Sequence, residues 1–148
     1  MSRLLEDRRT TFVVVSTLEA APVREAEFFI NALSGKRFHL GALILNKVLP
    51  TYLLDRAATT TAKKLCADAP QIAQSVAAGV GEPDQVARVL RELGESFLNY
   101  QVVAAREAEQ RAELGAAAEV VVTVPYFDSD IFDLTGLVQL GQRIWSSP

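Results

Sequence analysis

The side chains of this sequence best suited to binding or catalysis are an amide, an imidazole, a thiol and a short acidic cluster. Asn46 follows directly on the apolar run Ala42–Leu45. An amide both donates and accepts hydrogen bonds, so Asn46 can contact a ligand or satisfy backbone groups where a strand ends. The sequence leaves both roles open.

The imidazole and the thiol are the two possible centres of nucleophilic or acid–base chemistry. His39 is the only histidine and Cys66 the only cysteine. A cysteine nucleophile needs a base beside it, and nothing in the sequence indicates that these two residues meet. Structural roles are the favoured interpretation. The alternative is a small α/β enzyme that uses His39 or Cys66, in which alkylation of Cys66 abolishes activity.

The acidic cluster near the C-terminus consists of Asp128, Ser129, Asp130 and Asp133. Carboxylate oxygens suit Mg²⁺. Asp residues just before a helix also accept hydrogen bonds from its first N–H groups. Helix capping is the favoured interpretation of this cluster.

Three short apolar runs predict the strands that must position these groups. They are Thr11–Ser16, Ala42–Leu45 and Val120–Val124. Runs of this length, bounded by turn residues, are typical of strands buried on both faces of a parallel sheet. Ligands of such sheets bind beyond the carboxyl ends of the strands, where we expect Asn46 to lie. The sequence therefore predicts an α/β domain.

A helix is predicted between the first two strands, completing a right-handed βαβ unit over residues 1–50. Pro22 suits its first turn, and Gly35 is expected to end it in the left-handed conformation. Its predicted apolar stripe is Val23, Ala26, Phe29, Ile30 and Leu33.

Residues 51–118 carry helical periodicity only and predict an inserted helical subdomain. One helix is expected over 53–67, and a second from Pro70 with Ile72 and Val76 inside. A third runs from Pro83 to Gly115, with the inner residues Val86, Leu90, Leu93, Phe97, Tyr100 and Ala104. Residues 119–148 then supply the last strand and a final helix. The apolar face of that helix contains Leu134, Leu137, Val138, Gly141, Ile144 and Trp145, with Gly141 allowing close approach.

Composition narrows the class of protein. The 148 residues carry a net charge of −3, so no basic surface for nucleic acid is expected. No apolar run approaches the roughly 20 residues that a membrane-spanning helix needs. One cysteine excludes an internal disulfide framework, and the cytoplasm is the expected compartment.

Three segments, in order, resemble the C-terminal half of the arsenical pump-driving, or anion-transporting, ATPases. This family includes the ATPases that target tail-anchored membrane proteins. The segments are Thr-Thr-Phe-Val-Val-Val-Ser-Thr-Leu-Glu from Thr10, Ala-Leu-Ile-Leu-Asn-Lys-Val from Ala42, and Val-Val-Thr-Val-Pro-Tyr-Phe from Val121, the last followed by Leu-Thr-Gly-Leu-Val-Gln-Leu from Leu134. The resemblance implies one partial ATPase domain over 1–148. It would be the C-terminal part of a doubly wound parallel sheet of the P-loop NTPase type.

The resemblance also implies an ATP site and its residues. Asn46 matches the asparagine that contacts adenine, and Pro125 and Tyr126 match the loop on the other side of the ring. Phosphoryl transfer depends on the P-loop and its Mg²⁺, and neither the Walker loop nor the switch segments of the family occur in this sequence. ATP is thus the expected ligand, with Mg²⁺ only in a complete ATPase. Hydrolysis is expected only with a P-loop-bearing half. The family's zinc-binding cysteine pair is absent, so no zinc is implied.

The expected partners follow from the same resemblance. A P-loop-bearing chain or a membrane transporter would be the partner of a homo- or hetero-oligomer, and the edge of strand 11–16 would mediate association. The alternative function is a catalytically inert interaction or regulatory module that pairs with a P-loop partner chain.

Overall fold

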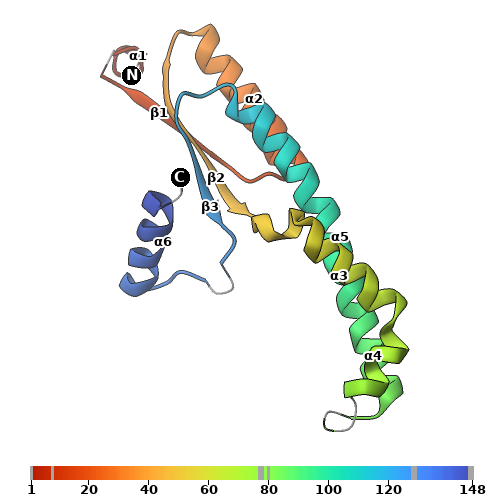
Figure 1. Cartoon of the computed structure of the whole chain (residues 1–148). Helices are drawn as coiled ribbons and strands as arrows, with labels where there is room; N and C mark the ends of the chain where they lie inside the picture. The colour runs from red at the N-terminus through yellow and green to blue at the C-terminus, as the bar shows by residue number, and fades with distance from the viewer. Residues whose placement is uncertain (1, 8, 77–78, 80, 128–129, 147–148) are drawn as a thin grey trace. The chain divides into compact units, whose positions relative to one another are not determined.

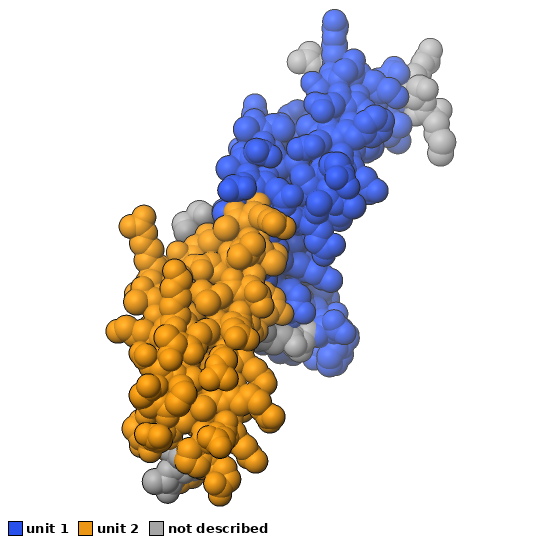
Figure 2. All heavy atoms as spheres, turned by 90° about the vertical axis from the view of Figure 1, so that its right-hand side faces the viewer, with its two compact units in different colours: residues 1–49, 107–148 blue, residues 50–106 orange. Residues whose placement is uncertain are grey.

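A computed structural model describes residues 2–7, 9–76, 79, 81–127 and 130–146. Its elements follow in the order α1 (Ser2–Leu5), β1 (Thr11–Ser16), α2 (Ala20–Gly35), β2 (His39–Val48), the 3-10 helix η1 (Thr51–Leu54), α3 (Arg56–Ala67), α4 (Ala69–Val76), α5 (Pro83–Gly115), β3 (Val121–Pro125) and α6 (Leu134–Ser146) (Figure 1). The chain divides into two compact units, residues 1–49 with 107–148 and residues 50–106 (Figure 2). The boundary within α5 falls between Arg106 and Glu107.

The first unit contains a three-stranded parallel sheet in the order β1-β2-β3. Val14 pairs with Leu43, and Leu43 pairs in turn with Val121. The predicted α/β class with three parallel strands is confirmed. β1 has the predicted bounds, whereas β2 extends beyond its apolar run at both ends.

One face of this sheet carries the hydrophobic core of the first unit. The core residues are Val14, Leu18, Val23, Ala26, Ile30, Leu33, Leu43, Leu45 and Leu114. Four of the five residues predicted for the apolar stripe of α2 belong to this core, namely Val23, Ala26, Ile30 and Leu33, and these four are confirmed. Phe29 is the exception, being 47% exposed, because it lies beside the face of α2 that packs on the sheet.

The other face of the sheet is largely open, so the predicted burial on both faces is wrong. Val15 is 61% exposed, and Val13 is exposed as well. In β2, Leu43 and Leu45 are fully buried, while Ala42 and Ile44 are only half-buried. The α2 side is packed, whereas α6 lies on the opposite side and covers little of it (Figure 1).

The C-terminal end of α2 differs from the prediction. Gly35 is still helical, and the residue in the left-handed region is Arg37, at φ 57°. The N–H of Arg37 donates to the carbonyl oxygen of Ser34 at 2.9 Å, and that of Phe38 to Leu33 at 3.0 Å. This is the Schellman arrangement, in which a left-handed residue just beyond the helix lets the N–H groups that follow donate to the last free carbonyl oxygens of the helix. Phe38 also packs against the core, which fixes the left-handed turn two residues beyond Gly35.

The apolar face predicted for the final helix exists but is not buried. Leu134, Leu137, Val138 and Trp145 of α6 are exposed, Trp145 at 87%. An added Cβ at Gly141 would meet nothing within 4 Å, so the predicted close approach there is wrong.

The second unit is helical, as predicted, but its inner positions differ. Its buried cluster is Ala69, Ala73 and Ala87, with Val86 and Leu90 packed against it. Val76, Leu93 and Tyr100, expected inside, are exposed, and Ile72 is half-buried. Small residues line the contact because the helices approach closely. A Cβ at Gly94 would lie 2.6 Å from Cys66 Sγ and 2.7 Å from the carbonyl oxygen of Ala62.

Candidate functional site

The sheet brings the three residues predicted to contact a ligand to the same edge. Val48 of β2 is the register partner of Pro125 of β3, and Asn46 lies two residues before Val48. The main-chain N–H of Tyr126 donates to the carbonyl oxygen of Val48 at 3.0 Å. The carboxyl ends of two neighbouring parallel strands therefore meet at Asn46, Pro125 and Tyr126, where ligands of open α/β sheets bind.

A bulge in β2 shapes this edge. The register with β3 shifts between Leu45 and Val48, and Lys47 between them has a φ of 58°. Bulges redirect side chains, and left-handed non-glycine residues store backbone strain, often at functional sites. Asn46 therefore lies inside the bulge. The apolar run had predicted that the strand ends at Asn46, whereas β2 continues to Val48. The pattern of residues gives no signal for such a bulge, because it arises from pairing with β3.

The Asn46 side chain is partly engaged by its own backbone. Its Oδ1 accepts the N–H of Lys47 at 2.9 Å, which is the structural role that the sequence left open. A carbonyl oxygen has a second lone pair, and the amide nitrogen carries two donors. No hydrogen bond from Nδ2 to another described residue is found, so the bonding capacity for a ligand remains.

Glu107 supports the segment after β2 and was not identified from the sequence. Its Oε2 accepts the main-chain N–H of Leu49 at 3.0 Å, in a partly buried position. The two residues are 58 positions apart, so no local pattern could have revealed the contact. The carboxylate satisfies a donor that β3 does not reach, and thereby positions the chain that follows Asn46.

Tyr126 supplies the apolar surface of the edge. The residue is 56% exposed, and Pro125 before it ends β3. An aromatic ring offers a flat face to another ring, and an amide offers both donors and an acceptor to its polar rim.

The other predicted candidates lie apart from this edge. His39 is exposed at the beginning of β2, the opposite end of the strand from Asn46. It lines a shallow groove of about 330 Å³ together with Asp7 and Arg37. Cys66 belongs to the second unit, where its Sγ lies 3.8 Å from the carbonyl oxygen of Arg91.

The acidic cluster includes a helix cap. Oδ1 of Asp133 accepts the N–H of Gly136 at 2.7 Å, at the first turn of α6. This confirms capping for Asp133, while Asp128 and Ser129 lie outside the described residues. Within the described ranges, no group of three or more His, Cys, Asp or Glu side chains could hold a metal ion. Nor does any helix there combine the length and apolar character needed to cross a membrane.

Comparisons with known proteins do not extend this description. No protein-family model matches the chain, and no curated protein matches its sequence.

Proposed function

We propose that this chain is the adenine-side half of an ATPase resembling the anion-transporting, arsenical pump-driving type. The observation that carries the proposal is the convergence of Asn46 with Pro125 and Tyr126. These residues are 79 and 80 positions apart in sequence, yet they occupy one edge through the pairing of Val48 with Pro125.

The residues present fit an adenine base. The amide of Asn46 can donate to a ring nitrogen and accept from the exocyclic amino group, using the donors and lone pair left by its bond to Lys47. Tyr126 can cover a face of the ring. Because the N–H of Tyr126 is already bonded to Val48, the loop is held in place before any ligand binds.

Hydrolysis belongs to the complete ATPase in this proposal. Catalysis of phosphoryl transfer is mainly positioning and charge stabilisation by a phosphate-binding loop and Mg²⁺. A second half or partner chain would supply that loop, and the parallel sheet would continue into a sheet of the P-loop NTPase type. A cytoplasmic location and coupling to a transporter or a client protein belong to the same proposal.

Titration calorimetry with ATP tests the adenine contact. We expect weak binding, with a Kd of about 1 mM, because only one side of the nucleotide is held. Asn46→Ala should reduce the affinity by about tenfold or more, through loss of hydrogen bonds to a half-buried amide. The matched control is Asn31→Ala, which removes an exposed amide from α2 and should change nothing.

A comparison with GTP makes the test specific. Guanine carries a carbonyl oxygen where adenine carries an amino group, so an edge built for adenine should prefer ATP. Equal binding of both nucleotides by the wild-type and Asn46→Ala proteins would contradict the proposal.

A catalytically inert interaction module is the second candidate. The edge of β1 that has no neighbouring strand favours it, together with the open sheet face that carries the exposed Val13 and Val15. If no nucleotide binds at millimolar concentration while a P-loop partner chain does bind, this second function is the better account.

A further inference from the structure

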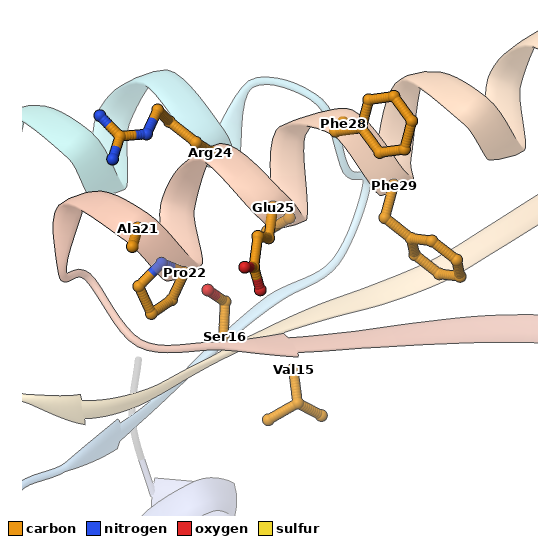
Figure 3. A pocket seen from close by; sticks show the side chains of 9 residues that line it. Val15, Ser16, Ala21, Pro22, Arg24, Glu25, Phe28 and Phe29 are labelled. Carbon is orange, nitrogen blue, oxygen red and sulfur yellow. The ribbon is translucent and has the colours of Figure 1, made fainter.

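A groove runs along the free edge of β1. It has a volume of about 630 Å³ and is lined by Val15, Ser16, Ala21, Pro22, Arg24, Glu25, Ala26, Phe28 and Phe29 (Figure 3). Ser16 points toward α2, whereas Val15 points to the opposite side of the sheet. A groove lined by side chains from both faces must wrap the edge of the strand. No described residue of β2 or β3 contributes to it, so it occupies the position of a neighbouring strand.

Helix α2 lines one side of this groove. Its core-facing stripe covers β1 and β2, while Phe28 and Phe29 extend from another side of the helix. Phe28 is 76% exposed. Two adjacent phenylalanines open to solvent beside an unpaired strand leave a large apolar area without a covering element.

Strand β1 lacks the charged residues and prolines that prevent the edge strand of a sheet from pairing with a strand of another chain. The sequence Thr-Phe-Val-Val-Val-Ser contains no charge and no proline, and alternate residues direct unpaired N–H and C=O groups outward. Such an edge accepts another strand without an electrostatic penalty.

The charges along α2 indicate which strand fits. The N-terminal part carries three carboxylates and one guanidinium, from Glu19, Arg24, Glu25 and Glu27. The C-terminal end carries two cations, Lys36 and Arg37. All six side chains are exposed. Two copies of α2 side by side and antiparallel would bring the net −2 end of each against the net +2 end of the other. A parallel arrangement would bring like charges together.

From these observations we propose that two copies of this chain associate through β1, antiparallel and about a two-fold axis perpendicular to the sheet. Isologous pairing of identical edges requires the antiparallel orientation. The result is a continuous six-stranded sheet with both α2 helices on one face. Phe28 and Phe29 of one copy then face those of its partner, and opposite charges meet at both ends. This inference concerns the chain without a P-loop-bearing half, which would compete for the same edge, and it does not depend on the nucleotide site.

Sedimentation without nucleotide tests it, over concentrations from about 1 μM to about 1 mM. The wild-type chain should show a monomer–dimer equilibrium that weakens with salt, because exposed charges contribute. Val15→Lys and Phe28→Asp should each raise the dissociation constant of the dimer by about tenfold or more, since both place a charge at the dimer interface. Both side chains are exposed, so the fold should survive, as circular dichroism can verify.

A control and a charge reversal complete the test. Val89→Lys changes a similarly exposed valine on α5 and should leave the dimer intact. Glu25→Lys with Glu27→Lys gives both ends of this charge pattern a net +2, because Glu19 remains, and Lys36→Glu with Arg37→Glu gives both ends a net −2. Each variant alone should be monomeric, and their mixture should form a heterodimer.

Three results would overturn the inference. They are a monomer throughout the concentration range, a dimer insensitive to Val15→Lys and Phe28→Asp, and dissociation by Val89→Lys. The first would assign the groove to a strand of another protein, and the last would move the interface to α5.

Discussion

The carboxylate of Glu107 accepts a hydrogen bond from the main-chain N–H of Leu49 at 3.0 Å, just beyond the end of β2. On the other side of that strand end, Val48 accepts the N–H of Tyr126. The segment following Asn46 is thus held from α5 and from β3 at once. The candidate site therefore depends on a residue that does not itself belong to the predicted contact set.

Removing this support should loosen the site. Glu107→Ala leaves the partly buried N–H of Leu49 without its acceptor, which costs about 1–3 kcal/mol. Hydrogen exchange measured by NMR should accelerate at Leu49. Glu107→Gln keeps a neutral acceptor and should lose less. Unchanged exchange at Leu49 in Glu107→Ala would show that this bond does not hold the segment.

Gly94 is expected to be intolerant of any side chain. A methyl group there would press on Cys66 Sγ and on the backbone oxygen of Ala62. The resulting strain of about 1–3 kcal/mol outweighs the gain of up to about 1 kcal/mol in helix propensity. Urea unfolding should therefore show that Gly94→Ala is destabilised. Gly141→Ala is the control: space is open there, and the same exchange should be neutral or stabilising.

Two substitutions at the C-terminal end of α2, one that introduces a glycine and one that removes a glycine, are both expected to preserve or increase stability. Arg37→Gly places the permissive residue at the left-handed position and should stabilise the fold by about 0.5–1 kcal/mol. Gly35→Ala should also be neutral or stabilising, because Gly35 is helical and its surroundings are open. A thermal melt distinguishes this from the sequence-based expectation. If Gly35 were the left-handed cap, Gly35→Ala would lower the Tm.

The pKa of Asp7 should depend on Arg9. The guanidinium donates two hydrogen bonds to the Asp7 carboxylate, at 2.8 and 3.1 Å, and with the Arg9 N–H lowers the pKa of that carboxyl. Because the folded pKa is depressed, any stabilisation is present above the ordinary pKa of an aspartate and is lost as pH falls through the folded value.

NMR titration of Asp7 measures this directly. Arg9→Gln should raise the pKa toward its ordinary range, and Arg24→Gln should leave it unchanged. An Asp7 pKa as depressed in Arg9→Gln as in the wild-type protein would mean that the side-chain pair does not form in solution, because only the main-chain N–H of residue 9 then lowers it.

Local patterns sufficed for the elements of the first unit. The apolar run of β1 and the three- and four-residue spacing of Val23, Ala26, Ile30 and Leu33 are properties of consecutive residues, and both were predicted correctly. The extent of burial was not, because it depends on which faces find a partner. Phe29 and Val15 are as apolar as the core residues, yet they lie beside or opposite the packed face.

The candidate site combines both kinds of information. The sequence by itself determined the residue types, the apolar strands and the placement of Asn46 and Pro125 near strand ends. Only the tertiary structure decided that β2 and β3 are neighbours, that Lys47 is left-handed in a bulge, and that Glu107 holds Leu49. Strand order, bulges and long-range hydrogen bonds depend on contacts between residues far apart in the chain, which periodicity along the sequence cannot encode.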